Sequence, residues 1–258
     1  MVLTADYHTH TPYSHGKNTV AENVERAAQL GLKEIAITDH GFTHLAFGIK
    51  RKEVPQFMAE CRAAEERFGI RVLRGIEGNV GGVYGACDLT EADYENFDVY
   101  LCGFHMATKY THAGDWFVNF FGNVLNHRLK VPCTDLLFRR NTRAYIETIK
   151  NHPIDILTHL NFQCACDTLE VAKCATDYGT YIELNSKKRH LSDEQLMEIV
   201  YKTDARFVID SDAHSVDRIG DMALVKEQLE RLNFPLDRID NIDGRLPTFR
   251  FTEFKKRM

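Results

Sequence analysis

The sequence has no long hydrophobic segment, no excess of positive charge and no paired CxxC motifs. No run approaches the roughly 18 apolar residues that a membrane-spanning helix needs, and no charged stretch at the N-terminus precedes an apolar one, as in a secretory signal. The net charge is −5, whereas proteins that coat nucleic acid are basic. The seven cysteines are expected to be reduced thiols. We therefore expect a cytoplasmic protein that contacts no membrane and no long nucleic acid.

The chain is long enough to bury a large core. Its 258 residues are 44% hydrophobic and 27% charged, which is typical of a globular protein. A barrel of alternating strands and helices routinely uses this length as one domain. The sequence contains no repeat, low-complexity segment or linker, so we expect a single domain over residues 1–258.

Short segments rich in Ile, Val, Leu and Tyr alternate with amphipathic stretches. Such apolar runs are typical of parallel strands that are buried on both faces. They predict strands at residues 2–8, 33–38, 71–77, 98–104, 155–159, 180–184 and 206–209. Helices are expected at 20–30, 53–68, 134–150, 168–178, 192–202 and 221–232, with Ser192 as an N-cap. The order of helix, glycine and strand recurs three times, which predicts an α/β fold with seven strands.

The alternation is interrupted between the fourth and fifth strands. Residues 105–154 include an aromatic stretch over 116–125, which we expect to be helical, and the helix at 134–150. Long insertions in barrel loops usually cap or line the site. A packing element or a contact between subunits of a homo-oligomer is the alternative.

His8 and His10 form an alternating pair at the end of the first predicted strand. Residues i and i+2 of a strand point to the same face, so the two imidazoles would lie side by side, with His15 close behind. Neutral imidazoles are ligands for zinc, manganese or iron. An isolated pair of this kind also arises by chance, so its meaning depends on the other strands.

Further ligand-type residues follow the other predicted strands. His40 follows the second strand, Glu77 ends the third, His105 ends the fourth and His159 ends the fifth. The carboxyl ends of barrel strands converge on one face. A polynuclear metal site is therefore predicted there, with nine candidate ligands: His8, His10, His15, His40, Glu77, His105, His159, Asp212 and His214.

The series HxH, TDH, GIE, GFH, ILTH and SDAH resembles the PHP family (polymerase and histidinol phosphatase). The strings LRGIE and CGFH are especially similar to stand-alone YcdX-like phosphatases and histidinol-phosphatase relatives. The resemblance implies a distorted seven-stranded (β/α) barrel that binds three divalent transition-metal ions (zinc, manganese or iron). It assigns one ion to His8, His10, Glu77 and Asp212, a second to Glu77, His105 and His159, and a third to His15, His40 and His214.

The sequence departs from the family pattern at two positions, and neither departure removes a ligand. His159 is followed by Leu160 and Asn161, where the family often has proline. Asp210 stands where a small residue is common, so it either adds a carboxylate near the metals or caps the strand. The length of the 105–154 segment also differs, so the substrate cannot be carried over from the family.

The expected reaction is hydrolysis of a phosphomonoester by a metal-bridging hydroxide. The resemblance to the PHP family implies that Glu77 bridges two ions and that Asp212 is a ligand, which could also accept a proton. The sequence shows no GxSxG nucleophile motif. Asp6 and Asp39 are candidates for holding the second ring nitrogen of the histidine ligands, and each could equally be an ordinary strand-end residue.

Basic residues that could bind phosphate follow the sixth strand. Arg189 is the candidate with the strongest argument, because this strand supplies no predicted metal ligand, and Asn185 could line the site similarly. Lys187 and Lys188 lie beside Arg189, and Arg139, Arg140 and Arg143 lie in the inserted segment. Each of them could equally be a solvated surface charge. His44 and His112 have no assigned role.

Three functions are consistent with this sequence. The first is a phosphatase for small phosphorylated molecules, with histidinol phosphate as one candidate. The second is a phosphodiesterase or nuclease for nucleotides or oligonucleotides, which the acidic net charge disfavours for long nucleic acids. The third is a non-catalytic metal-binding module, and the complete set of nine ligands argues against it.

Overall fold

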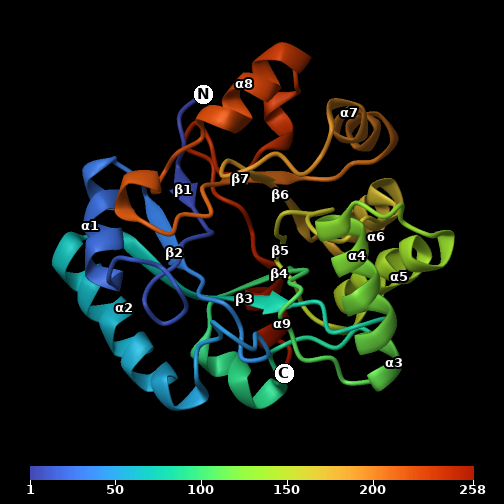
Figure 1. Cartoon of the computed structure of the whole chain (residues 1–258). Helices are drawn as coiled ribbons and strands as arrows, with labels where there is room; N and C mark the ends of the chain where they lie inside the picture. The colour runs from blue at the N-terminus through green and yellow to red at the C-terminus, as the bar shows by residue number, and fades with distance from the viewer.

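Seven parallel strands form one sheet in the sequential order β1 to β7 (Figure 1). The structure, a computed structural model, describes residues 1–258 except for the side chain of residue 113. The strands are β1 (Ala5–Asp6), β2 (Glu34–Ile37), β3 (Arg71–Asn79), β4 (Val99–Gly103), β5 (Ile156–Leu157), β6 (Tyr181–Asn185) and β7 (Phe207–Asp210). The prediction of seven strands is confirmed, although β1 and β5 are shorter than expected.

Strands β1 and β7 approach each other and nearly close the sheet into a barrel. A parallel bridge joins Thr9 to Ala213 just beyond the strand ends. Below it, the buried side chain of Asn241 donates to the carbonyls of Ala5 and Ile209 at 2.9 and 2.7 Å and accepts the Ile209 amide at 2.9 Å. The fold is therefore the predicted seven-stranded (β/α) barrel.

Five long helices alternate with the strands and cover the outside of the barrel (Figure 1). They are α1 (Val20–Gln29), α2 (Val54–Phe68), α6 (Thr168–Tyr178), α7 (Asp193–Lys202) and α8 (Ala223–Leu232). Thr19 and Ser192 cap α1 and α7 with reciprocal capping boxes. Gly69 and Gly179 end α2 and α6 in the left-handed conformation. Ser192 and the two glycines are signals from which the sequence predicted the helices, whereas Thr19 was not predicted as a cap.

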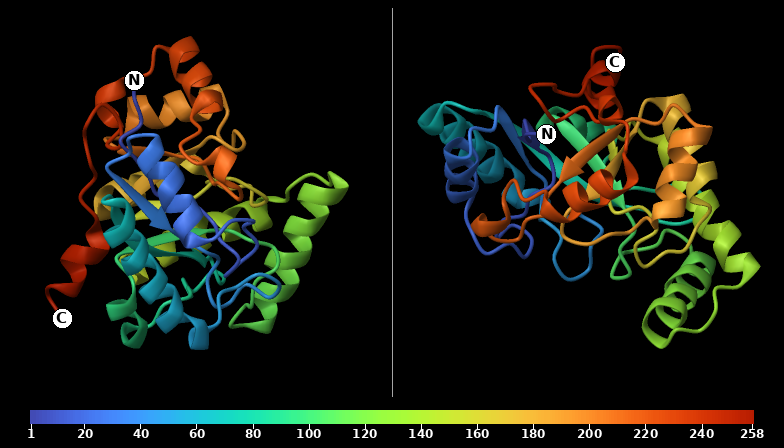
Figure 2. Two further views of the ribbon diagram at one scale, coloured as in Figure 1. Left: turned by 90° about the vertical axis from the view of Figure 1, so that its left-hand side faces the viewer. Right: turned by 90° about the horizontal axis from the view of Figure 1, so that it is seen from above.

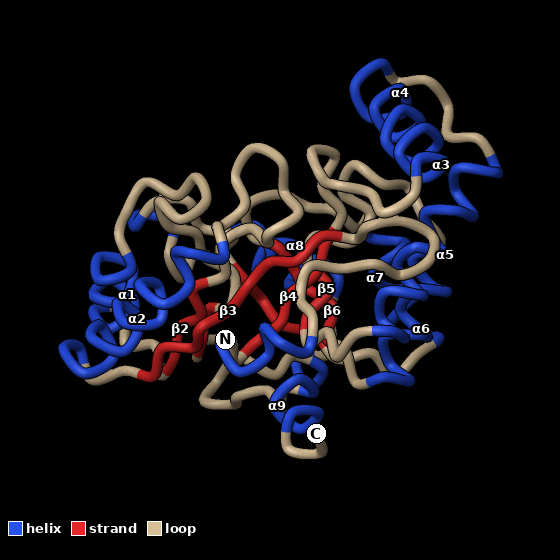
Figure 3. The backbone as a smooth tube through the Cα atoms, turned by 90° about the horizontal axis from the view of Figure 1, so that it is seen from below, coloured by secondary structure: helices blue, strands red, loops and turns tan.

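The helical segment between β4 and β5 projects from the barrel in its first part (residues 113–129), whereas its last helix packs on the barrel, where Tyr145 and Ile149 are fully buried (Figures 2 and 3). It comprises α3 (Ala113–Asp115), a π-helix (Trp116–Phe121), α4 (Gly122–Leu129) and α5 (Asp135–Asn151). The buried amides of Asn123 and Asn141 exchange hydrogen bonds of 3.0 and 2.9 Å, which join α4 to α5. Phe117 and Leu129 remain 62% and 66% exposed on this segment.

The C-terminal segment packs on the side of the barrel opposite the long connecting loops (Figure 3). It contains α9 (Arg250–Lys255), which the sequence analysis did not predict. The carboxylate of Asp155 accepts the backbone amide of Phe251 at 2.8 Å and so anchors α9 beneath β5. Short 3-10 helices lie at Arg51–Glu53, Glu91–Asn96, Val216–Arg218 and Leu236–Arg238. None of the helices in the described residues is long and apolar enough to cross a membrane.

Candidate metal centre

The histidines predicted from separate strands come together at the carboxyl ends of the strands. His10 lies near the middle of this group, because its position after β1 places it between the residues that follow β2 and β7. Its ring centroid is 5.0 Å from that of His8, 4.7 Å from His40 and 4.2 Å from His214. The ring of His15 is stacked on that of His40 at 5.0 Å. The convergence that was expected from the barrel geometry therefore exists.

Glu77 is the carboxylate around which the imidazoles gather. It is fully buried near the end of β3. Its Oε1 lies 2.8 Å from His159 Nε2 and 3.3 Å from the Nε2 atoms of His8 and His105. Its Oε2 lies 2.7 Å from His40 Nδ1. One carboxylate thus has four imidazoles, from four different strand ends, within 3.3 Å.

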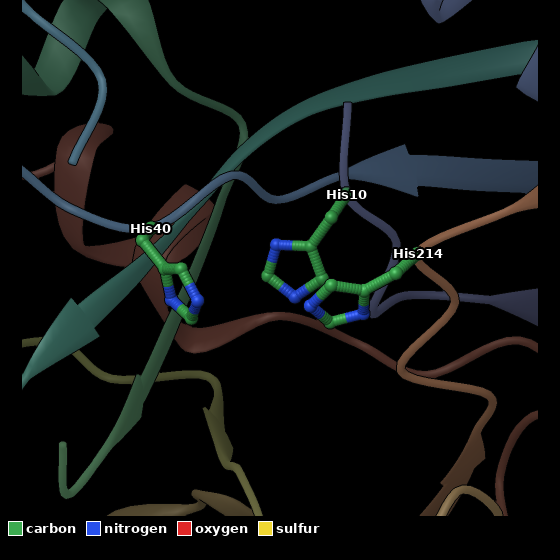
Figure 4. Close-up of side chains that lie close together, drawn as sticks. All are labelled: His10, His40 and His214. Atoms are coloured by element: carbon green, nitrogen blue, oxygen red, sulfur yellow. The ribbon is translucent and has the colours of Figure 1, made fainter. Parts of the chain in front are cut away.

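Three overlapping sets of residues could each hold a cation. Within each set, the ligand atoms lie within 4.8 Å of one another. These sets are His8, His10 and Glu77; His40, Glu77 and His105; and His10, His40 and His214 (Figure 4). The first set contains three of the four residues predicted for one ion, and the Oδ1 atom of the fourth, Asp212, lies 3.5 Å from His10 Nε2. The other two sets combine residues of different predicted ions.

Burial and the charges of neighbouring groups together set the protonation of these residues. It lowers the pKa of His40 to about 3 and lowers the pKa of His10 well below its usual value. Burial also opposes protonation of His8, but nearby carboxylates, Glu77 foremost, outweigh it and raise its pKa. Burial would raise the pKa of Glu77, yet the surrounding histidines hold it well below its usual range. Neutral His10 and His40 beside an ionised Glu77 have the form that binds a transition metal, whereas His8 would have to release its proton to bind one.

Several fully buried polar atoms in this cluster make no hydrogen bond of acceptable geometry, including His40 Nδ1 and Glu77 Oε2, which lie 2.7 Å apart. Buried polar atoms in proteins nearly always have one, because leaving them unpaired costs free energy. The unpaired atoms are His8 Nε2, His10 Nε2, His40 Nδ1, His159 Nδ1 and Glu77 Oε2. Because most of them face one another around Glu77, they fit the coordination of cations.

Two predicted ligands have a backbone conformation that residues other than glycine rarely adopt. The φ angles of His159 and Asp212 are 32° and 49°. Such conformations cost free energy and concentrate at functional sites. Gly103 leaves room for the ring of His159, since a Cβ atom at Gly103 would lie 2.5 Å from that ring.

A model of the PHP domain family matches residues 6–187, more than half of the chain. The chain belongs to the PHP domain family. It is 28% identical to a probable phosphatase of Proteus mirabilis over 254 residues, which cover 93% of this chain and 90% of the relative. It is also 28% identical to a probable phosphatase of Caldanaerobacter subterraneus over 253 residues, which cover 93% and 87%. The PHP resemblance is thus confirmed, and the protein is a metal-dependent phosphoesterase.

Solved structures of histidinol phosphatases share the fold of this PHP protein. The histidinol phosphate phosphatase of Lactococcus lactis, solved with zinc, L-histidinol and phosphate, aligns with a TM-score of 0.60 and 13% identity over 97% of this chain and 98% of its own. A Listeria monocytogenes protein described as a putative histidinol phosphatase aligns with a TM-score of 0.56 and 14% identity, over 84% of this chain and 97% of its own. At these identities the likeness supports the fold alone.

Two residues that orient histidines of the candidate metal centre, called the PHP site below, were not predicted from the sequence. Glu183 on β6 contacts His8 Nδ1 through Oε1 at 2.5 Å, and its Oε2 accepts the His159 backbone amide at 2.6 Å. Asn79 Oδ1 lies 2.9 Å from His105 Nδ1. Both residues occupy strands, where a polar side chain inside an apolar run was the only available signal.

The three additional aspartates make contacts that hold the backbone around the PHP site. Asp6 accepts hydrogen bonds from Ser211 and Gly220, and Asp39 accepts them from Thr11 and Ser14. For Asp6 and Asp39 these contacts fit the alternative of ordinary strand-end residues better than the role of holding histidine rings. The third, Asp210, accepts the Tyr7 amide at 2.8 Å and so ties β7 to β1.

The predicted substrate residues lie at different places around the PHP site. The Arg189 guanidinium lies 2.9 Å from Glu227 on α8. The Asn185 amide donates to Asp212 at 3.3 Å, while its oxygen accepts backbone amides of the following loop. Arg139 and Arg143 line an open groove between α5 and α6.

Of the two unassigned histidines, only His44 joins the cluster. Its ring centroid lies 4.7 Å from that of His40 and 5.6 Å from that of His105. The position of His44 four residues after His40 was the only sequence signal for this role. His112 is exposed and instead contacts Tyr84 at 4.6 Å.

Proposed function

We propose that this protein is a metal-dependent phosphomonoesterase that acts on small phosphorylated molecules. The observation that carries this proposal is the group of buried, unpaired ligand atoms around Glu77. The relatives that are named probable phosphatases support the reaction class. The Lactococcus lactis neighbour binds L-histidinol and phosphate, which makes histidinol phosphate the first substrate to test.

The nine predicted ligands would hold three divalent transition-metal ions. When bound, such ions would lower the pKa of a bound water toward about 7 and neutralise the phosphoryl oxygens. Imidazole and carboxylate ligands suit zinc, manganese or iron. The overlapping sets of ligand atoms support a polynuclear site, and the assignment of each ligand to one ion stays a prediction.

Residues of the chain itself would orient the site and move the proton. Glu183 and Asn79 contact the Nδ1 atoms of His8 and His105, so the Nε2 atom of each ring faces Glu77. Asp212 is nearly buried, yet the positive charges near it hold its pKa well below its usual range. We assign Asp212 the role of accepting the proton of the attacking water, because it is the ionised carboxylate at the exposed edge of the cluster.

The decisive experiment measures metal content together with two model substrates. Protein loaded with zinc, manganese or iron is assayed with p-nitrophenyl phosphate and with bis(p-nitrophenyl) phosphate. We expect hydrolysis of the monoester at a rate well above that of the diester. Faster hydrolysis of the diester would favour a phosphodiesterase, and no turnover of either ester by metal-loaded protein would favour a non-catalytic module.

Replacing ligands tests whether the cluster performs the reaction. His8→Ala and Glu77→Ala are each expected to lower kcat/KM for the monoester by at least ~100-fold, because each change removes a group that would bind metal directly. His112→Ala is the matched control, since His112 lies outside the cluster. Full activity of either ligand variant would contradict the mechanism.

A further inference from the structure

Three consecutive basic residues follow β6, and their side chains have different partners. The Arg189 guanidinium pairs with Glu227 of α8 at 2.9 Å. Lys188 Nζ lies over the Phe162 ring, 5.4 Å from its centroid. Only Lys187 of the three contacts predicted metal ligands: its Nζ is 3.2 Å from Asp212 Oδ1 and 3.1 Å from His214 Nδ1.

The turn at the start of this loop fixes the backbone position of Lys187. The side-chain oxygen of Asn185 accepts the backbone amides of Lys187 and Lys188 at 2.9 and 3.2 Å, which forms an Asx turn. The amide nitrogen of the same side chain donates to Glu183 and to Asp212 at 2.9 and 3.3 Å. The backbone of Lys187 is therefore tied to the carboxylate that its own ammonium group contacts.

The contacts of the Lys187 ammonium group cannot all persist when cations bind. Asp212 and His214 are predicted ligands, and an ammonium group about 4 Å from a divalent cation is repelled by it. The flexible four-carbon stem allows the ammonium group to move, and the side chain is 46% exposed. Because the Asx turn holds the backbone, the ammonium group remains at the rim of the site.

At this rim, the ammonium group of Lys187 could form a charge-assisted hydrogen bond with an anion that binds to the metal ions. We propose that Lys187 binds the phosphoryl group of the substrate, whereas Lys188 and Arg189 do not. This inference rests on the proposed phosphatase function. A charge-assisted hydrogen bond to an anion contributes about 1.5–3 kcal/mol, so its loss corresponds to roughly a 10- to 100-fold change in kcat/KM.

The test compares Lys187→Met with Lys188→Met, which removes the same charge one residue along the same loop. Both variants are brought to the metal content of the wild type, and kcat/KM for p-nitrophenyl phosphate and the inhibition constant of inorganic phosphate are measured. We expect Lys187→Met to weaken both by about 10- to 100-fold and Lys188→Met to change each by less than about 3-fold. Lys187→Arg should recover part of the loss, because it restores the positive charge.

Several results would overturn the inference. They are an unchanged Lys187→Met variant, an equal loss in Lys188→Met, or a larger loss in Arg189→Met. A further contradicting result would be that Lys187→Met loses metal but, once metal is restored, is inhibited by phosphate as the wild type is. Lys187 would then position the metal ligands and would not bind the substrate.

A separate measurement distinguishes this inference from the proposed function. Calorimetric titration of inorganic phosphate into metal-loaded protein needs no turnover. If the wild type hydrolyses no phosphomonoester but binds phosphate more tightly than Lys187→Met does, the proposed function fails and the role of Lys187 stands. If the wild type is active and both proteins bind phosphate equally, only the role of Lys187 fails.

Discussion

Glu183 links two predicted metal ligands that are far apart in the sequence. One carboxylate oxygen contacts the ring of His8 and the other accepts the backbone amide of His159. Carboxylates that orient histidine ligands commonly change metal affinity by ~10- to 100-fold when they are removed. We therefore expect Glu183→Ala to weaken metal binding by that factor, measured by competition with a chromophoric chelator.

The control for this prediction is Glu25→Gln, which changes an exposed glutamate on α1. Glu183→Gln should lie between the wild type and Glu183→Ala, because the amide retains one oxygen for the His159 backbone. Unchanged metal affinity in Glu183→Ala would show that the ring of His8 is positioned without this carboxylate.

Gly103 provides a second prediction at single-residue scale, because a Cβ atom would not fit there. It would lie 2.2 Å from Thr158 Oγ1 and 2.5 Å from the His159 ring. Gly103→Ala is therefore expected to displace His159, with loss of bound metal by elemental analysis and at least a ~10-fold fall in activity. Gly114→Ala is the matched control, since a Cβ atom there meets nothing within 4 Å. Normal metal content in Gly103→Ala would contradict this account.

The candidate ligands could be predicted residue by residue, whereas the residues that support them could not. The ligands stand at or just beyond strand ends, and a known barrel geometry brings those ends together. Glu183 and Asn79 lie within buried strands, where the sequence does not reveal which ring nitrogen a polar side chain will meet. The direction of the Lys187 side chain likewise depends on contacts with Asp212 and His214, which are distant in sequence.

At the scale of elements, the strands and long helices followed local signals, but the C-terminal segment did not. Helix ends were predictable because capping residues and glycines act within one turn. Helix α9 and the residues near Asn241 are positioned by contacts with β1, β5 and β7. Such contacts join residues as many as 236 positions apart, which no local pattern reveals.

The prediction at the scale of elements concerns the contribution of Asn241 to stability. Its side chain makes three buried hydrogen bonds that join β1 to β7. At about 1 kcal/mol each, with buried partners left unpaired, Asn241→Ala should lower the free energy of unfolding by ~3 kcal/mol or more. Denaturant unfolding measures this loss. Asn151→Ala, which removes one exposed hydrogen bond, should cost less than ~1 kcal/mol, and equal losses in the two variants would contradict the role of Asn241.

At the scale of the whole molecule, the metal site connects strands from both ends of the chain. Its predicted ligands lie near or just beyond the carboxyl ends of β1 to β5 and β7, so bound ions would hold together the strand ends around the nearly closed barrel. The same ligands carry buried, unpaired atoms without metal, and unpaired buried groups destabilise the fold. Metal should therefore bind the folded chain far more strongly than the unfolded chain.

Removing the metal should consequently lower the thermal stability of the whole barrel. A ligand present at 1,000 times its Kd stabilises the native state by about 4.1 kcal/mol. For a chain of this size each kcal/mol shifts Tm by about 2–4 °C, so excess chelator should lower Tm by roughly 8–16 °C. Scanning calorimetry with and without chelator measures the shift, and added zinc or manganese should reverse it. The Glu77→Ala variant is the control, since its Tm should respond much less to chelator. An equal response in both proteins would show that the ions stabilise the barrel at another site.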